Sequence, residues 1–367
     1  MKLSIRTVNT SKYPVLIGDG IMEQLQKELK NSRKLKSRLF ILTDTNTQRF
    51  CLPELFAHIP ELEAATVLSV DSGEEVKTLR TAEYLWKELG SHQADRSSLL
   101  INLGGGVVTD LGGFVASSFH RGIDTIHIPT SLIGQIDAAI GGKTGVNIDV
   151  LKNQVGTFYA PRGVYVWPGF LRTLPIEHVR SGLAEVAKTA LIRDEQFWRW
   201  LSRKPVQQIQ ETPFSENVWK EILLKTIRIK LEIVRHDPFE KNERKLLNFG
   251  HTIGHAIESL ALRRETPVLH GDAVAAGMLC EGFLSVLRTG LDPLQLEEIS
   301  HWVIQGFGKL PLLQEDEAVR MDMMQHDKKN RQQEIRFSLL SEIGKGKINQ
   351  VCTPDQIREA FATYYNL

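Results

Sequence analysis

The sequence predicts an α/β, Rossmann-like N-terminal domain followed by an all-α C-terminal domain. Short β-rich runs alternate with helical patterns through the first part of the chain, which is typical of a parallel sheet. From about Pro175 onward the β signal fades and helical periodicity dominates. A length of 367 residues favours two domains. We place them at 1–172 and 173–367, with the boundary near residues 168–178.

Each predicted element has its own local signal. The expected strands are Pro14–Ile17, Arg38–Thr43, Ala65–Val70, Ser98–Leu103 and Thr125–Ile128, separated by helical stretches such as Ile21–Leu29 and Val76–Leu89. The clearest helices of the second half are Phe197–Leu201, Val218–Val234 and Lys245–Leu262. Ile335–Leu340 is either a strand or a short buried run, and periodicity does not decide between them.

Composition narrows the class of protein. A formal net charge of +1, with no basic block that contains aromatic residues, disfavours a nucleic-acid partner. The N-terminus has no signal-peptide pattern, and no apolar run approaches the roughly 20 residues of a membrane span. Cys51, Cys280 and Cys352 are too few and too scattered for a disulfide framework or a cysteine metal site. We therefore expect a cytoplasmic enzyme with a small-molecule substrate.

A glycine-rich turn is the first candidate binding site. Gly104, Gly105 and Gly106 follow a predicted strand and precede a helical pattern, an order that lets backbone N–H groups approach a phosphate. This is not the GxGxxG fingerprint, and a tight turn without a ligand is the alternative. Two further stretches, Thr43–Asn46 and Ser72–Lys77, resemble the rest of a nucleotide site, although either is also compatible with a helix-capping turn.

A polar stripe in the second half is the most informative pattern. On a helix, Arg244, Asn248, His251 and His255 stand at i, i+4, i+7 and i+11, which places them on one face. The glycines at 250 and 254 each cost about 1 kcal/mol in a helix interior, so we expect something packed closely against their backbone. Buried histidines satisfied by hydrogen bonds are the alternative to a metal site.

Two other residues are candidate metal ligands. Glu185 is the only carboxylate in an apolar helical run, and Lys188 lies one turn away, so a buried Glu–Lys pair is its alternative role. His270 precedes a glycine and an aspartate. One glutamate and two histidines bind a divalent metal with one position left open, as in catalytic sites. Spacing alone does not say which two of His251, His255 and His270 are ligands.

Several basic residues occur in or beside motifs rich in Gly, Asn or Thr. They are Arg121, Lys143, Lys152, Lys230 and Arg244. Loops of this composition often hold anions. Each residue alone is more simply a surface charge, but together with the glycines and histidines they indicate phosphate and carboxylate binding.

In their order along the chain, these motifs resemble the 3-dehydroquinate synthase family of the sugar-phosphate cyclase superfamily. The matches include GGGVVTDLGGFVAS, IGGKTGVN, LKNQVGTFYAP, SGLAEVAK, ERKLLNFGHTIGHAIES and LHGDAVAAGM, and they end at Asp327–Asn330. The resemblance covers nearly the whole chain. It implies a Rossmann-like domain, a helical domain, an active site between them and, usually, a homodimer.

The resemblance also implies roles for individual residues. A metal, zinc or cobalt, would bind Glu185, His251 and His270, with His255 facing the substrate or lying behind the ligands. NAD+ would contact Asp44, Asn46, Glu74, Lys77, Gly105, Gly106, Val107, Thr109, Asp110, Thr130, Ser131, Asp137, Lys143, Lys152, Phe170 and Thr173. The substrate would contact Lys143, Lys152, Asn153, Lys188, Lys230, Arg244, Asn248 and a lysine of the 328–329 pair, which we take as Lys328. Arg121 would come from the neighbouring subunit.

The implied reaction converts 3-deoxy-D-arabino-heptulosonate 7-phosphate to 3-dehydroquinate and phosphate, a step of aromatic amino acid biosynthesis. NAD+ would be reduced and reoxidised within one turnover, with the metal polarising the oxidised oxygen. The alternatives are a sister cyclase that makes an inosose or a valiolone, a simple polyol dehydrogenase, and a degenerate nucleotide-binding homologue. Lys230, Arg244, Asn248 and His255 favour a substrate that carries a carboxylate.

Four positions depart from the pattern usual in this family. His178 stands where many members have an acidic residue, Ser131 replaces a second threonine, Leu151 replaces a glycine, and Asp272 replaces a glutamate after His-Gly. His178 puts one contact on the NAD+ side in doubt. None of the four removes an expected metal ligand.

Overall fold

The computed structural model describes residues 5–10, 12–31, 38–148, 151–212, 214, 216–325 and 334–367. They form two compact units: Met1–Pro175 with Pro213–Leu231, and Ile176–Thr212 with Glu232–Leu367. The chain passes from one unit to the other within α9 (Asn217–His236). The division into functional domains 1–172 and 173–367 stays a prediction.

The first unit is built on a seven-stranded sheet of order β1-β2-β9-β6-β5-β3-β4. Its strands are β1 Arg6–Asn9, β2 Pro14–Ile17, β3 Leu39–Asp44, β4 Thr66–Val70, β5 Leu99–Gly104, β6 Asp124–Pro129 and β9 Gly163–Val166. Only the β1–β2 pair is antiparallel among these strands. The parallel sheet is therefore confirmed, and each of the five predicted strands overlaps an observed one.

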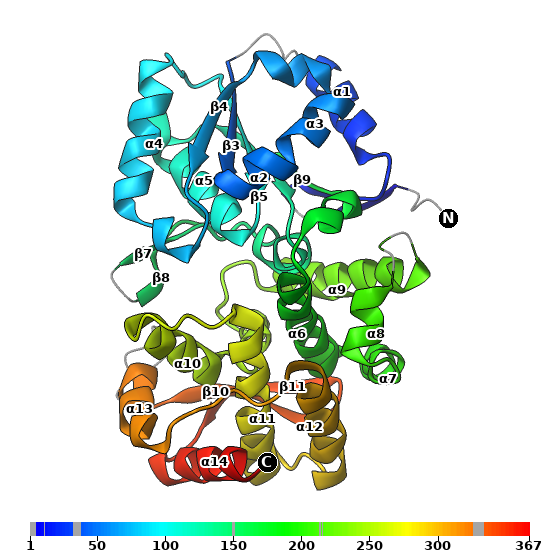
Figure 1. Cartoon of the computed structure of the whole chain (residues 1–367), viewed down its shortest axis with the longest axis vertical. Coiled ribbons are helices and arrows are strands. Elements are labelled where there is room, and N and C mark those ends of the chain that lie inside the picture. Colours follow the sequence, from blue (N-terminus) through cyan, green and yellow to red (C-terminus); the bar gives the residue numbers. More distant parts are fainter. Residues whose placement is uncertain are drawn as a thin grey trace. The chain divides into compact units, whose positions relative to one another are not determined.

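Helices cover both faces of this sheet (Figure 1). They are α1 Ile21–Asn31, α2 Thr45–Phe50, α3 Leu52–His58, α4 Leu79–Ser91 and α5 Gly106–Ser118. Ile41 of β3 and Ile101 of β5 are buried in one core cluster with α1 and α3 residues, whereas Phe40 and Leu100 are buried in another with α4 and α5 residues. Because both faces are buried, these strands read as continuous apolar runs.

The strand order reverses direction between β3 and β5. From β3 the chain runs outward to β4, and from β5 it runs the opposite way to β6. Register pairs Gly104 at the end of β5 with Pro129 at the end of β6. In open α/β sheets, ligands bind beyond the carboxyl ends of the strands at such a reversal. The fold therefore puts the glycine-rich turn at the expected ligand edge. A two-stranded antiparallel hairpin, β7 Val146–Ile148 and β8 Leu151–Val155, completes the unit.

The second unit is mainly helical, as predicted. Its helices are α6 Ile176–Arg193, α7 Glu195–Ser202, α8 Val206–Glu211, α10 His251–Arg263, α11 His270–Thr289, α12 Pro293–Phe307, α13 Glu317–Gln325 and α14 Pro354–Asn366. The α11 helix is buried along most of its length and packs against α6, α10, α12 and α14. The undecided run Ile335–Leu340 contributes to strand β10 (Arg336–Glu342), which pairs with β11 (Lys345–Val351).

The predicted helix Lys245–Leu262 is wrong at its start. Residues Glu243–Asn248 form a 3-10 helix, and α10 begins only at His251. Gly250 separates the two with a left-handed φ of 78°, so the four stripe residues do not lie on one face of a single helix. The physical reason is a cap from another helix: the Glu281 carboxylate accepts hydrogen bonds from the N–H groups of Gly250 and Ile253.

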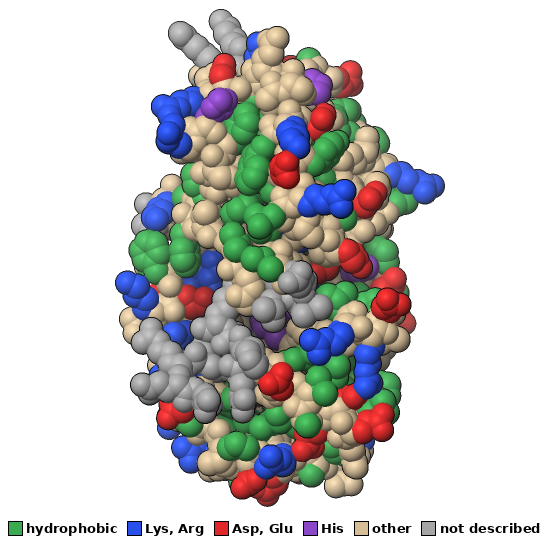
Figure 2. Space-filling model, turned by 90° about the vertical axis from the view of Figure 1, so that its left-hand side faces the viewer, with side chains coloured by type: hydrophobic (Ala, Val, Ile, Leu, Met, Phe, Trp, Pro, Cys, Tyr) green, Lys and Arg blue, Asp and Glu red, His purple; other side chains and the backbone are tan. Residues whose placement is uncertain are grey.

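The surface carries mixed charge. Figure 2 shows Lys and Arg side chains interspersed with Asp and Glu side chains on the face it draws. Within the described part of the chain, no helix is both long and apolar enough to span a membrane.

Candidate active site

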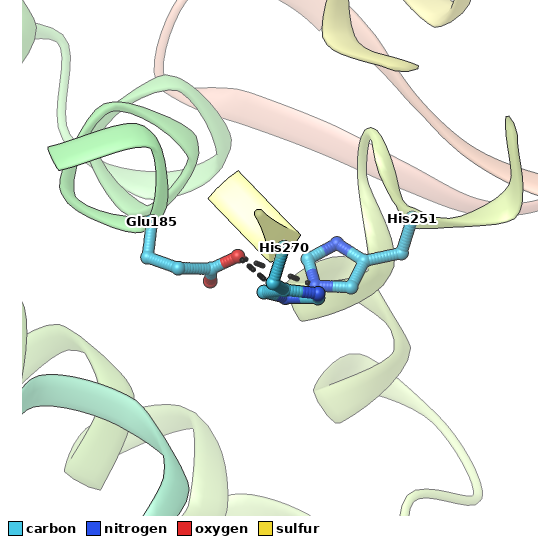
Figure 3. A group of neighbouring side chains, drawn as sticks. All are labelled: Glu185, His251 and His270. Carbon is cyan, nitrogen blue, oxygen red and sulfur yellow. Dashed lines mark ion pairs between the residues drawn. The ribbon is translucent and has the colours of Figure 1, made fainter. Parts of the chain in front are cut away.

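Three side chains from three helices converge in the second unit (Figure 3). Glu185 lies in the middle of α6, His251 is the first residue of α10, and His270 is the first residue of α11. Oε1 of Glu185 lies 3.4 Å from Nε2 of His251 and 3.4 Å from Nε2 of His270. The structure therefore brings together the three residues predicted to bind metal.

This donor set fits a divalent metal. Two ligands of a tetrahedral zinc ion stand about 3.4 Å apart, because each bond is about 2.1 Å long. Glu185 is 1% exposed; its Oε2 lies 2.7 Å from Nζ of Lys188, whereas its Oε1 accepts no well-aligned hydrogen bond from any described residue. A buried carboxylate without such bonds is unfavourable unless a cation is bound nearby. The charge, burial and spacing of this group are those of a metal site.

Close packing between α10 and α11 positions the two histidines. A Cβ on Gly250 would lie 2.7 Å from Cγ of Met278, and one on Gly254 would lie 3.0 Å from the Ala273 oxygen. A Cβ on Gly277 of α11 would overlap the Gly250 oxygen. The glycines thus allow the two helices to touch backbone to backbone, which confirms the expectation of a close neighbour. The helices run antiparallel, with Gly250 beside Gly277 and Glu258 beside His270, and the rings of His251 and His270 meet between these ends at 5.3 Å, centroid to centroid.

Electrostatics act in different directions on the three donors. Although burial opposes it, Lys188 and His251 hold the pKa of Glu185 well below its usual value. Burial lowers the pKa of His251, which favours the neutral ring. Burial would also lower the pKa of His270, but the carboxylates of Glu258 and Glu185 outweigh it and raise the pKa to about 10.

The alternative role of Glu185, a buried pair with lysine, is also present. Nζ of Lys188 lies 2.7 Å from Oε2 of Glu185 and donates to the backbone oxygen of Leu247 at 3.0 Å. The pair uses one carboxylate oxygen, whereas the histidines face the other. The two roles therefore coexist.

Of the remaining predicted residues of this unit, His255 lies beside the two histidines, and Arg244 and Asn248 are held by other partners. The His255 ring lies 5.2 Å from the His251 ring and 6.0 Å from the His270 ring, centroid to centroid. Arg244 is buried, and its Nη1 donates to the Pro238 oxygen at 2.7 Å. Asn248 Nδ2 donates to Oε1 of Glu240 at 2.8 Å. Lys328 lies outside the described residues.

Sequence reasoning missed two carboxylates of this region. Glu240 bonds to Asn248, and Glu258 lies beside His270. The only sequence signal for Glu258 is its helical spacing, seven residues after His251.

In the first unit, the glycine turn offers backbone donors. Helix α5 begins at Gly106 with Gly105 as its N-cap, and no side chain caps it. A Cβ at Gly105 would lie 3.2 Å from Oγ of Ser131, and one at Gly106 would lie 3.1 Å from Cβ of Ala138. An uncapped helix N-terminus with little room for side chains is suited to a phosphate. Val107, Thr109 and Thr130 lie at the same turn, where Thr130 N–H donates to the Gly104 oxygen.

A polar network follows this turn. Nζ of Lys77 lies 2.6 Å from Oδ2 of Asp110 and 2.5 Å from Oδ1 of Asn153. Burial raises the pKa of Asp110, and Lys77 opposes that rise. Asn153 has a left-handed φ of 53°, so the network holds it in a conformation that few residues adopt. Lys152 lies 4.0 Å from Glu74 at the edge of the same network.

Lys230 and Asp137 form a second ion pair, in which Asp137 is partly exposed. Nζ of Lys230 donates to the backbone oxygen of Asp137 at 2.6 Å and also to its carboxylate. Lys230 is 6% exposed. The structure thus joins a residue predicted to bind substrate with one predicted to bind NAD+.

Other predicted residues have local structural roles or are exposed. Asp44 caps α2 by accepting from the Thr47 N–H at 2.7 Å. Phe170 packs in the core, with its ring centroid 4.8 Å from that of Trp167, and its backbone oxygen accepts from the Thr173 hydroxyl at 3.3 Å. Three further predicted residues have exposed side chains: Asn46, Arg121 and Lys143. Arg121 has a left-handed φ of 66°.

The chain is similar to known proteins over nearly its whole length. Family models described as 3-dehydroquinate synthase N-terminal and C-terminal match residues 67–181 and 182–330. A 3-dehydroquinate synthase of Parabacteroides distasonis is 38% identical over 96% of this chain and 98% of its own. One of Halorhodospira halophila is 37% identical over 95% of each chain.

Solved structures with a similar fold include two synthases. The 2-epi-5-epi-valiolone synthase of Streptomyces hygroscopicus, with NAD+ and Zn2+ bound, has a TM-score of 0.82 and 25% identity over 98% of this chain and 99% of its own. A 2-deoxy-scyllo-inosose synthase complexed with carbaglucose-6-phosphate, NAD+ and Co2+ has a TM-score of 0.83 and 22% identity over the same shares. The second likeness shows the fold alone.

Proposed function

The chain belongs to the 3-dehydroquinate synthase family, and we propose on that basis that it converts 3-deoxy-D-arabino-heptulosonate 7-phosphate to 3-dehydroquinate and phosphate. The observation that carries the proposal is that Nε2 of His251 and Nε2 of His270 each lie 3.4 Å from Oε1 of Glu185. The chain is also 38% identical to a curated member over nearly its full length. The reaction makes it a phosphate-eliminating carbon–oxygen lyase.

The proposed cofactors are NAD+ and a divalent metal, zinc or cobalt. When bound, NAD+ takes up and returns a hydride, and the metal polarises the oxygen of the hydroxyl that is oxidised. Glu185, His251 and His270 would hold the metal. The N–H groups at Gly105 and Gly106 would bind the pyrophosphate of NAD+, with Lys77 and Asp110 lying along the same edge.

The chain's own cations would bind and orient the substrate. Lys143, Lys152, Lys230 and Arg244 supply positive charge for one phosphate and one carboxylate, and Asn153 and Asn248 supply amide donors. Ion pairs already hold Lys230 against Asp137 and Lys188 against Glu185. Fixed donors of this kind hold a flexible substrate in one conformation, which is a large part of the catalytic task for a ring closure.

Two further parts of the proposal concern assembly and location. We propose a homodimer in which Arg121 reaches the substrate of the neighbouring subunit; its exposed side chain lies in a turn where His120, Arg121 and Gly122 all have positive φ. A cytoplasmic location stays a prediction from the sequence.

An assay of phosphate release tests the function. The purified protein with NAD+ and zinc should release phosphate from the heptulosonate phosphate and much more slowly from sedoheptulose 7-phosphate or glucose 6-phosphate. Preference for either of the last two sugars would replace the proposal with the valiolone or inosose alternative.

A variant pair ties that activity to the metal site. His251→Ala removes one metal ligand, so it should abolish both phosphate release and metal retention. The Glu185–Lys188 pair stays intact in this variant. His301→Ala removes an exposed histidine of α12 in the same unit and should behave as the wild type. A fully active, metal-free His251→Ala protein would contradict the site assignment.

A further inference from the structure

A buried carboxylate with no assigned role lies against one of the metal-site histidines. Glu258 of α10 is 6% exposed, and its Oε2 lies 3.2 Å from Nδ1 of His270. On the other side of the ring, Nε2 of His270 lies 3.4 Å from Oε1 of Glu185. The imidazole of His270 is therefore held between two carboxylates, one at each ring nitrogen.

A metal-binding histidine must present a bare nitrogen to the cation. A hydrogen bond at the other nitrogen decides which one is bare and fixes the ring orientation. His251 shows this arrangement with a neutral acceptor, because its Nδ1 lies 3.1 Å from the Phe249 backbone oxygen while its Nε2 faces Glu185. In His270 the corresponding acceptor is the charged Glu258, and such charge-assisted bonds are about twice as strong as neutral ones.

We propose that Glu258 is a positioning residue for the metal site. It accepts the Nδ1 proton of His270, holds Nε2 of that ring toward Glu185, and makes Nε2 a stronger donor for the cation. Glu258 itself contacts neither the metal nor the substrate in this role. The inference rests on the proposed metal site at Glu185, His251 and His270.

A single helix, α10, carries both His251 and Glu258. Glu258 lies seven residues after His251, so both side chains lie on the same face of α10. One helix thus supplies a ligand of its own and also the group behind the ligand of α11. Orientation of His270 then depends on the packing of α10 against α11.

A competing arrangement uses the same atoms as a second cation site. Ligand atoms of His255, Glu258 and His270 also lie within 4.8 Å of one another. That site would need His270 to lose both ring protons and bridge two cations. A single proton on Nδ1 satisfies Glu258 and leaves Nε2 for one metal, so the geometry favours positioning.

The test compares zinc binding by the wild type, Glu258→Gln and Glu258→Ala. Gln keeps a neutral acceptor, as His251 has from Phe249, and Ala keeps none. The control is Thr252→Val, a near-isosteric change on α10 at a buried hydroxyl that has no hydrogen-bond partner among the described residues. Metal-free proteins are titrated with zinc against a chromophoric chelator, bound metal is counted by atomic emission, and the cobalt forms are compared by their visible absorption.

The expected result is one ion per chain throughout, with affinity about 10- to 100-fold lower for Glu258→Gln and lower still for Glu258→Ala. The cobalt bands should shift in these variants and not in Thr252→Val. Wild-type affinity and an unchanged cobalt spectrum in Glu258→Gln would overturn the inference, and this variant decides the matter if Glu258→Ala does not fold.

Two other outcomes would also overturn the positioning role of Glu258. They distinguish a failure of that role from a failure of the proposed function. Two ions per wild-type chain and one per Glu258→Gln chain, with the remaining affinity unchanged, would assign a second cation site. Failure of the wild type to retain zinc would remove the proposed metal site itself.

Discussion

At the scale of single residues, the carboxylate of Glu185 contacts both candidate histidine ligands and Lys188. One oxygen faces Nε2 of both His251 and His270, and the other lies 2.7 Å from Nζ of Lys188. Such a buried group has a strong effect when any partner is removed, because an unpaired buried charge destabilises a protein by about 3–5 kcal/mol. This is why a neutral ligand, His251, is the better position at which to test the metal.

A buried histidine of the first unit should make stability depend on pH. His127 on β6 is 4% exposed, and burial lowers its pKa to about 4 from an ordinary value of 6.5. The folded state therefore favours the neutral ring, so its contribution is fully present above pH 6.5 and is lost as the pH falls toward 4. Between pH 7.5 and 5.0 we expect a loss of about 2 kcal/mol from this residue.

Urea unfolding of the wild type and His127→Gln at the two pH values measures this contribution. The wild type should lose more stability than the variant by that amount, because the variant has no proton to bind at this position. Equal losses in both proteins would show that His127 does not titrate in this way.

The sequence identified the chemistry of individual residues better than their partners. Glu185, Lys188 and the three histidines were recognisable from residue type and from motifs that resemble a known family. Glu258 was not, because its contact with His270 depends on how α10 packs against α11. Contacts between side chains of two different helices cannot be inferred from residue spacing along either helix.

At the scale of elements, glycines determine how closely α10 and α11 approach. Gly277→Ala would drive a Cβ into the Gly250 oxygen, so we expect a loss of about 1–3 kcal/mol from overpacking and weaker zinc binding, because both helices carry a ligand. The matched control is Gly90→Ala in α4, where no neighbouring atom lies within 4 Å of the new Cβ. That change should stabilise the protein by about 0.4–1 kcal/mol.

Thermal unfolding and zinc titration of the two variants decide the matter. If Gly277→Ala unfolds at the wild-type temperature and binds zinc normally, the close helix contact is not what holds the two histidines in place.

Strands were easier to predict than helix starts. The buried sheet produces apolar runs bounded by polar turns, and these are visible in the sequence as β3, β4 and β5. The true start of α10 was not visible, because the carboxylate that caps it comes from Glu281, 31 residues beyond Gly250. The polar stripe therefore predicted one continuous helix. The structure instead has a 3-10 helix, a glycine with left-handed φ, and then helix α10.

At the scale of the whole molecule, the two sets of proposed cofactor residues belong to different compact units. The glycine turn lies in the first unit, and the metal donors lie in the second. Alternating strands and helices in the first half, followed by helices, allowed an α/β part and a helical part to be predicted. The passage of α9 through both units was not predictable, because it depends on which packing partners each end of that helix finds.

The central claim is that Glu185, His251 and His270 bind one catalytic metal in a 3-dehydroquinate synthase that uses NAD+. Anomalous diffraction from crystals grown with cobalt and NAD+ measures it most directly. We expect a single strong peak bonded to those three side chains, with the pyrophosphate of the dinucleotide at the N–H groups of Gly105 and Gly106. A peak at other residues, or three side chains pointing to separate regions with no peak among them, would contradict the account.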